Sequence, residues 1–148
     1  KELTSGSNAA MGLTIPISIG AAVAKPNYQI LAITGDGSLE LNIQELKTIS
    51  QYNLNIKLFV INNGGYVSMH NWQDTFFEGR RVDSTKDTGE GTLNLKNIAD
   101  AFELNYYKIS NYRGIDEDLK KIMNNNKPLF IEVLTDHKQK IYDSFKDF

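Results

Sequence analysis

The stretch QILAITGDGS, residues 29–38, joins a short apolar run to one aspartate, Asp36, that stands between two glycines. The run is typical of a buried parallel strand. A second such run, Ile56–Ile61 (IKLFVI), leads directly into residues 62–65 (NNGG). Because ligands of parallel sheets bind outside the carboxyl ends of the strands, the sequence predicts that Asp36 and the two asparagines face one ligand.

Helix-like and strand-like segments alternate along the rest of the chain. This order favours an α/β fold: a doubly wound, mostly parallel sheet with helices on both faces. Pro16 predicts a kink or break in the first helix, residues 64–92 show little regular pattern, and residues 136–148 indicate an amphipathic closing helix. Helices are expected over Ser7–Lys25, Leu39–Gln51, Asn94–Glu103 and Ile115–Asn124, and strands over Gln29–Thr34, Ile56–Ile61, Tyr106–Ile109 and Leu129–Leu134.

Composition narrows the class of protein. The 148 residues, 41% hydrophobic and 23% charged, suit one soluble domain, and we expect a single domain over 1–148. A net charge of −2 without a basic run excludes a nucleic-acid footprint, and the absence of cysteine excludes disulfides and thiolate metal sites. Without a signal peptide or a membrane-length apolar stretch, we expect no membrane partner and a cytoplasmic location. Because the chain opens at Lys1 close to its motifs, we expect a piece of a longer protein.

The residues around Asp36 predict phosphate binding assisted by a metal ion. A helix is expected directly after Asp36, and its free amide groups, with Gly37 and Ser38, suit an anionic phosphate. A carboxylate and a side-chain amide are hard oxygen donors that suit Mg²⁺ or Ca²⁺. A backbone carbonyl from Gly64 or Gly65 could add a third ligand. The prediction is a divalent cation that holds a diphosphate on the protein.

These residues resemble the thiamine diphosphate signature, in which G-D-G is followed after a similar interval by N-N. Here 24 residues separate Gly37 from Asn62. The resemblance is to acetolactate synthases in particular and covers residues 4–79, with the remainder similar only in its pattern of elements. Three stretches carry it: residues 7–26 (SNAAMGLTIPISIGAAVAKP), residues 35–49 (GDGSLELNIQELKTI) and residues 71–77 (NWQDTFF).

The resemblance implies the thiamine diphosphate-binding fold, with thiamine diphosphate and Mg²⁺ as cofactors. Asp36 and Asn63 would ligate Mg²⁺ through their side chains, and Gly65 through its carbonyl oxygen. Gly37 and Ser38 would hold the diphosphate. The metal and phosphate ligands would thus all follow the two predicted strands.

The same resemblance implies how the rest of the cofactor and the substrate are held. Met11 would be the bulky residue beneath the cofactor. The backbone of Ala9 and Met11 would form hydrogen bonds with its pyrimidine ring, and Tyr66 is also expected to bind the cofactor. Trp72 would line the substrate pocket with Ser68, which stands where acetolactate synthases carry a methionine. Since Gly-Gly-Tyr after the asparagines is closer to pyruvate-type decarboxylases, the identity of the substrate stays open.

The leading hypothesis is the Mg²⁺-dependent pyrophosphate-binding domain of an acetolactate synthase-like enzyme. Such an enzyme decarboxylates a 2-oxo acid and transfers the acyl carbanion unit to a carbonyl acceptor. A 2-oxo acid decarboxylase or a sugar-ketone carboligase is the alternative, and a non-catalytic α/β interaction module is a remote one. A haloacid-dehalogenase-type phosphatase also has G-D-G after a strand, but its upstream D-x-D and closely following N-D are missing here.

No catalytic residue is assigned within the chain. Enzymes of the resembling family activate the pyrimidine with a glutamate from a separate pyrimidine-binding domain, supplied by the partner subunit. We therefore expect the chain alone to be inactive and to work with that domain of the same or a partner subunit, in a homo-oligomer, on a small 2-oxo acid. His70 and His137 are expected to be ordinary surface histidines.

Overall fold

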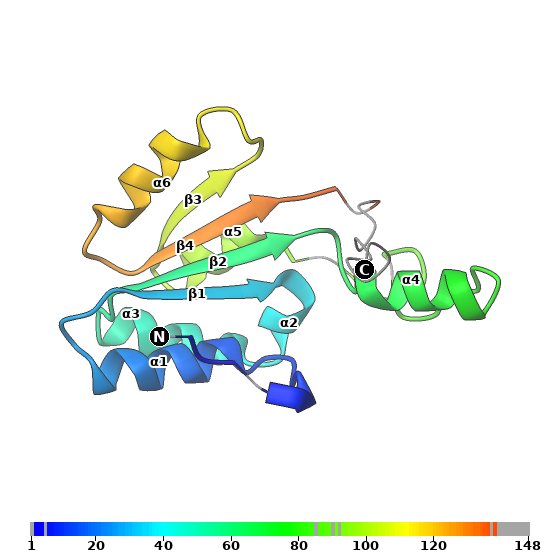
Figure 1. Ribbon diagram of the computed structural model, residues 1–148, viewed down its shortest axis with the longest axis horizontal. Coiled ribbons are helices and arrows are strands. Elements are labelled where there is room, and N and C mark those ends of the chain that lie inside the picture. The colour runs from blue at the N-terminus through cyan, green and yellow to red at the C-terminus, as the bar shows by residue number, and fades with distance from the viewer. Residues whose placement is uncertain are drawn as a thin grey trace, which may run out of the picture.

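Four strands form one all-parallel sheet in the order β1-β2-β4-β3 (Figure 1). The computed structural model describes residues 2–4, 6–84, 86–89, 91, 93–136 and 138. The strands are β1 (Ile30–Gly35), β2 (Ile56–Asn62), β3 (Asn105–Ile109) and β4 (Leu129–Leu134). The helices described are α1 (Thr14–Ala24), α2 (Asp36–Glu40), α3 (Leu46–Gln51), α4 (Val67–Phe76), α5 (Leu95–Ala101) and α6 (Ile115–Met123), with 3₁₀ turns η1 (Gly6–Asn8) and η2 (Ile43–Glu45).

Helices cover both faces of this sheet, which confirms the predicted α/β class. On one face Phe130 of β4 packs in a cluster with Ile15 of α1 and Leu46 of α3. On the other face Ile131 of β4 packs with Ile122 of α6. Figure 1 shows α1 and α3 on one side of the strands and α6 on the other. Because neighbouring residues of β4 point to opposite covered faces, the strand is a nearly continuous apolar run.

The register of the strands fixes where the functional loops begin. Gly35 of β1 pairs with Ile61 of β2, so Asp36 and Asn62 follow at the same edge of the sheet. The carboxyl end of β4 reaches this edge as well, because the backbone N–H of Thr135 donates to the carbonyl of Asn62 at 3.0 Å. The carboxyl ends of three strands therefore border the site.

Two helices differ from their prediction. The first begins at Thr14, and Pro16 lies in its first turn without breaking it, because first-turn N–H groups have no acceptor within the helix. The helix predicted over Leu39–Gln51 is divided into α2, η2 and α3. It is interrupted at Asn42, which leaves helical geometry (φ −141°, ψ 35°) and donates its side-chain amide to the carbonyl of Gly12 at 3.0 Å.

The segment 64–92, predicted to be irregular, contains α4, which extends beyond the carboxyl ends of β1 and β2 (Figure 1). Its large apolar side chains, among them Met69, Trp72 and Phe76, are exposed, so no apolar stripe marked the helix in the sequence. The predicted closing helix lies outside the described residues, apart from Asp136 and Lys138. In the described part of the chain no helix has both the length and the apolar character needed to cross a membrane.

Candidate functional site

The loops that follow β1 and β2 meet in what we call the Asp36 junction, made of residues 36–38 and 62–65. The carboxylate of Asp36 is buried, with 7% of the residue exposed. Its Oδ2 accepts hydrogen bonds from the backbone N–H groups of Gly64 and Gly65, each at 3.0 Å, and its Oδ1 accepts one from Gly37 at 3.0 Å. The two loops that the sequence pointed toward one ligand thus lie in direct contact.

Backbone geometry at the two glycines makes this contact possible. Gly64 has φ +81° and Gly65 has φ +118°, values that residues with a Cβ atom adopt only with strain. In this conformation two consecutive N–H groups point at a single carboxylate oxygen. The glycines after the asparagines therefore orient Asp36.

Asn63 completes the junction through its side-chain amide. The amide atom on the side of Asp36 lies 2.9 Å from the carbonyl oxygen of Gly65 and 3.2 Å from Oδ1 of Asp36. Both neighbours are acceptors, so without a metal ion the nitrogen occupies this place and donates to both oxygens. With the amide rotated, its oxygen would join them in a set of three hard donors. An octahedral ion with bonds of about 2.1 Å places neighbouring ligand oxygens about 3.0 Å apart. With the Asn63 oxygen turned to this side, the spacing would fit a small divalent cation.

Acidic and imidazole side chains alone do not form such a site. Among the residues that the structure describes, no group of three His, Cys, Asp or Glu side chains is placed to hold a metal ion. A cation at the junction would depend on one carboxylate, one amide and one backbone carbonyl. All three are the oxygen donors that Mg²⁺ prefers over softer metals.

The segment before α1 is fixed beside the junction. The backbone N–H of Gly12 donates to Oγ of Ser38 at 2.8 Å, and its carbonyl accepts from Asn42. A Cβ atom at Gly12 would lie 2.9 Å from the amide nitrogen of Asn42, so the approach is too close for a larger residue. Ala9 is exposed with φ +44°, and Met11 is 47% exposed, so this methionine does not fill the core.

A second buried carboxylate, Glu132 of β4, lies behind the junction. Its Oε1 accepts from the side-chain amide of Asn62 at 2.6 Å, and its Oε2 accepts from the hydroxyl of Tyr106. Burial, and then the hydrogen bond to Glu132, raises the pKa of Tyr106 above its ordinary value of 10.0. Glu132 was not predicted as a site residue; its signal in the sequence is a single charge inside the apolar strand LFIEVL.

The other sequence-predicted side chains lie on or next to α4. Tyr66, half-buried, precedes the helix and links it to the junction, whereas Ser68 is exposed and does not line the groove defined next. Trp72 is 61% exposed, and its ring centroid lies 4.7 Å from that of Phe76. The Trp72 groove, as we call it, has a volume of about 590 Å³ and is lined by Met69, Trp72, Gln73, Phe77, Arg80 and Val82.

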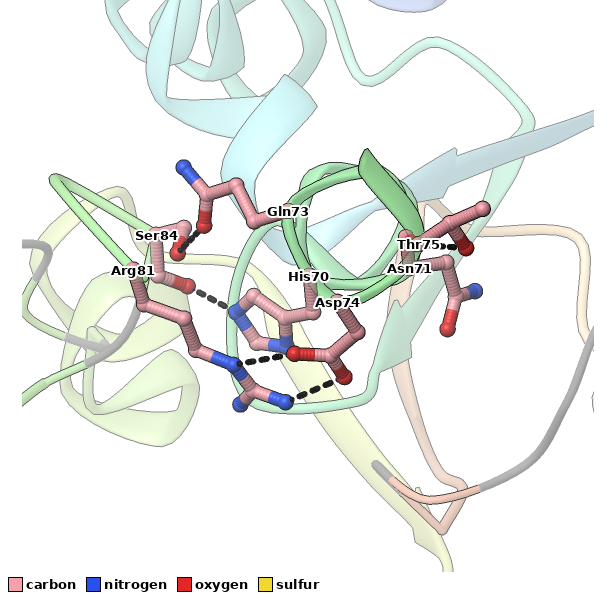
Figure 2. Close-up of polar contacts among 7 residues, drawn as sticks. All are labelled: His70, Asn71, Gln73, Asp74, Thr75, Arg81 and Ser84. Carbon is pink, nitrogen blue, oxygen red and sulfur yellow. Dashed lines mark hydrogen bonds and ion pairs between the residues drawn. The ribbon is translucent and has the colours of Figure 1, made fainter. Parts of the chain in front are cut away.

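The segment after α4 folds back and is tied to the helix (Figure 2). His70 donates from Nε2 to the carbonyl of Ser84, and the hydroxyl of Ser84 donates to Gln73 at 2.6 Å. The guanidinium of Arg81 donates two hydrogen bonds to Asp74, at 3.1 and 2.7 Å, and hydrogen bonding to this guanidinium is the main cause that lowers the pKa of Asp74. Of the residues in these contacts, Gln73 also lines the Trp72 groove.

The expectation of a surface histidine was wrong for His70. The residue is only 6% exposed, and its ring faces a carbonyl oxygen, which requires a proton on Nε2. Its partner, Ser84, lies in an irregular segment, so no periodic pattern in the sequence connected the two. His137, the other histidine, lies outside the described residues.

Comparison with known proteins agrees with this geometry. Residues 1–133 match the family described as thiamine pyrophosphate enzyme, C-terminal TPP binding domain. The chain is 36% identical over 132 residues to the acetolactate synthase large subunit of Lactococcus lactis subsp. lactis (strain IL1403), which covers 89% of this chain and 22% of the relative. It is 36% identical over 140 residues to the acetolactate synthase isozyme 1 large subunit of Escherichia coli (strain K12), and the match covers 95% of this chain and 24% of the relative. It is 32% identical over 142 residues to the acetolactate synthase large subunit of Cyanidium caldarium, and the match covers 96% of this chain and 24% of the relative. The chain thus spans about a quarter of the length of these relatives.

Proposed function

Because the chain belongs to the thiamine pyrophosphate (thiamine diphosphate) enzymes, as their C-terminal TPP-binding domain, we propose that it binds the cofactor diphosphate through Mg²⁺ at the Asp36 junction. The observation that carries this proposal is the approach of the Asn63 amide to within 2.9 Å of the Gly65 carbonyl and 3.2 Å of Asp36 Oδ1. These separations suit neighbouring ligands of one octahedral ion. Asp36, Asn63 and Gly65 would hold the metal.

Ser38 and Gly37 would receive the diphosphate next to the metal. The hydroxyl of Ser38 accepts its hydrogen bond from Gly12, so its own proton is free to donate to a phosphate oxygen. Gly37 is buried beside Asp36, and no side chain at this position bars a phosphate from the backbone. The negative charge of the diphosphate would be balanced by the metal, since the carboxylate of Asp36 alone would repel it.

The segment at residues 9–12 would hold the other end of the cofactor. Gly12 ties this segment to Ser38, so the half-exposed Met11 and the exposed Ala9 lie beside the proposed diphosphate site. Their contacts to the pyrimidine, and a contact from Tyr66, are proposed from the family resemblance. When bound, the cofactor supplies an electron sink for cleavage next to a carbonyl group.

We propose that the complete enzyme decarboxylates a 2-oxo acid and transfers the acyl unit to a carbonyl acceptor, as the names of the relatives suggest. Trp72 would contribute to substrate selection through its groove, with Ser68 nearby in sequence. A pyrimidine-binding domain of the same or a partner subunit would supply the activating glutamate in a homo-oligomer. The chain spans only 22% to 24% of the length of the relatives.

A calorimetric titration of the complete gene product with thiamine diphosphate tests the cofactor proposal. We expect binding in Mg²⁺ that is lost in EDTA and in Asp36→Ala. The matched control is Asp74→Ala, which removes an exposed aspartate paired with Arg81 and should leave cofactor binding unchanged. Binding that is equally tight in EDTA, or in Asp36→Ala, would contradict the metal role of the junction.

Product analysis separates the proposed reaction from its alternatives. With a 2-oxo acid as sole substrate, a carboligase forms a longer hydroxy-keto acid, whereas a decarboxylase releases the aldehyde. A sugar-ketone carboligase needs a ketose donor. Release of aldehyde alone would replace the first proposal by the decarboxylase, whose sequences the Gly-Gly-Tyr stretch resembles more closely, whereas Ser68 is compatible with either alternative.

A further inference from the structure

Glu132 is a carboxylate in a place where an apolar residue would be expected. It lies on β4 among strand residues buried on both faces and is 5% exposed. Its partners are the Asn62 amide, the Tyr106 hydroxyl and, at 3.8 Å, the ammonium group of Lys108. Apolar replacements of buried charged groups are often neutral or stabilising. The stability of the strand therefore does not by itself require a carboxylate here.

The contact with Asn62 connects Glu132 to the Asp36 junction. An ionised carboxylate only accepts hydrogen bonds, so it fixes the Asn62 amide with its nitrogen toward Glu132. The amide oxygen then faces the backbone N–H of Gly64 at 3.3 Å. That same N–H donates to Oδ2 of Asp36 at 3.0 Å. A continuous set of hydrogen bonds thus joins β4 to the turn that orients Asp36.

We propose that Glu132 is a positioning residue for the metal site, acting through Asn62 on the turn at residues 62–65. This inference rests on the proposed function of the junction. Without Glu132 the Asn62 amide is free to rotate, and the turn that presents Asn63 and the Gly65 carbonyl loses its support from the sheet. Partners of metal ligands typically change metal affinity by 10- to 100-fold. This role does not require Glu132 to contact the cofactor.

The test measures the Mg²⁺ concentration that gives half-maximal thiamine diphosphate binding in the complete gene product. We expect Glu132→Ala to raise this concentration about tenfold or more, with binding restored at high Mg²⁺. Asn62→Ala should have a similar effect. The double variant should be no worse than either single variant, because both remove the same connection.

Two further variants distinguish positioning from a general loss of stability. Glu132→Gln keeps an oxygen for Asn62 and should recover most of the Mg²⁺ affinity. Ile131→Ala, the neighbouring residue of β4 on the opposite face, is fully buried in the cluster with α6. It should lower the unfolding temperature and leave the half-saturating Mg²⁺ concentration unchanged.

The outcomes separate this inference from the proposed function. If the wild-type protein shows no Mg²⁺-dependent cofactor binding, the proposed function fails and the role of Glu132 fails with it. If the wild type binds but Glu132→Ala has an unchanged Mg²⁺ requirement, or Ile131→Ala shifts it equally, the positioning role alone is overturned. Should Glu132→Ala fail to fold, an unchanged Mg²⁺ requirement in Asn62→Ala would overturn the positioning role, because Glu132 is proposed to act through the Asn62 amide. A wild-type Mg²⁺ requirement in Glu132→Gln together with a raised one in Asn62→Ala would support it.

Discussion

The Asp36 junction and the Trp72 groove both follow β2, yet they are built in different ways. The junction is buried and depends on backbone groups: three N–H groups orient one carboxylate, and two of them come from a loop 28 and 29 residues further along the chain. The groove is made by side chains within residues 69–82, and Trp72, its largest member, is mostly exposed. One site depends on how the chain is folded, the other on which side chains it carries.

This difference suggests how one fold supports several reactions. Backbone positions such as Gly65, with φ +118°, accept few replacements, so the geometry of the junction resists change. Side chains on an exposed helix can be replaced without disturbing the sheet, because surface substitutions usually change stability little. Cofactor binding and substrate choice should therefore respond to separate sets of mutations.

The largest effect is expected for Gly65→Ala. A Cβ atom at φ +118° is strained by about 1–3 kcal/mol. The strain would displace both the N–H that binds Asp36 and the carbonyl proposed as a metal ligand. We expect the Mg²⁺ affinity, measured through cofactor binding, to fall by about 100-fold.

Gly64→Ala is the graded control for this variant. Its φ of +81° lies nearer the left-handed region that other residues occasionally adopt, and a Cβ atom there meets nothing within 4 Å. The loss of affinity should therefore be smaller. Equal, wild-type-like Mg²⁺ dependence in both variants would break the idea that the backbone of this turn controls the site.

The junction could be predicted from the sequence because its signals are local. Apolar runs mark β1 and β2, and the glycines and asparagines directly after them mark the loops. What the sequence did not predict depends on partners far along the chain. The helix breaks at Asn42 because Gly12, 30 residues away, accepts its amide, and Glu132 contacts Asn62 across 70 residues.

The groove was harder to predict for a second reason. The helix α4 turns large apolar residues such as Met69 and Trp72 outward, opposite to the pattern by which amphipathic helices are recognised. His70 is buried against Ser84 by a segment without periodic structure. Only the resemblance to a known family drew attention to Trp72, and its role in selecting the substrate stays a prediction.

The second-largest effect is expected for His70→Ala, which breaks the tie between α4 and the segment that follows it. The variant leaves the Ser84 carbonyl without its donor in a buried place, so the unfolding free energy should fall by about 1–3 kcal/mol. Hydrogen exchange at residues 80–84 should become faster. His70→Gln, whose amide can still donate, should be milder.

The same variant also tests whether the two sites are independent. The Mg²⁺ requirement of His70→Ala should stay within about twofold of wild type, since the contacts of His70 and of Asp36 are separate. A change as large as that of Gly65→Ala would show that the groove and the junction are one cooperative unit.

A smaller effect on stability, with a clear effect on products, is expected for Trp72→Ala. Because the side chain is 61% exposed, the unfolding free energy should change by about 0.5 kcal/mol or less. The ratio of products from two competing acceptors should shift by about tenfold, the scale at which apolar contacts discriminate substrates. Tyr112→Ala removes an exposed aromatic residue, 80% exposed, from another part of the chain and is the matched control. Unchanged product ratios would remove Trp72 from substrate selection.

The smallest effect is expected for Arg81→Gln, which breaks the ion pair with Asp74. The Arg81 guanidinium holds the pKa of Asp74 below its ordinary value of 3.8, so the pair contributes to stability above that pH. The contribution is lost as the pH falls through the lowered pKa, and wild type and Arg81→Gln should then become equally stable. Since exposed ion pairs contribute little, NMR titration of the Asp74 carboxyl is the sharper measurement. A return of its pKa toward 3.8 in Arg81→Gln is expected. An unchanged pKa would mean that the Arg81 guanidinium is not the main cause of the lowered pKa of Asp74.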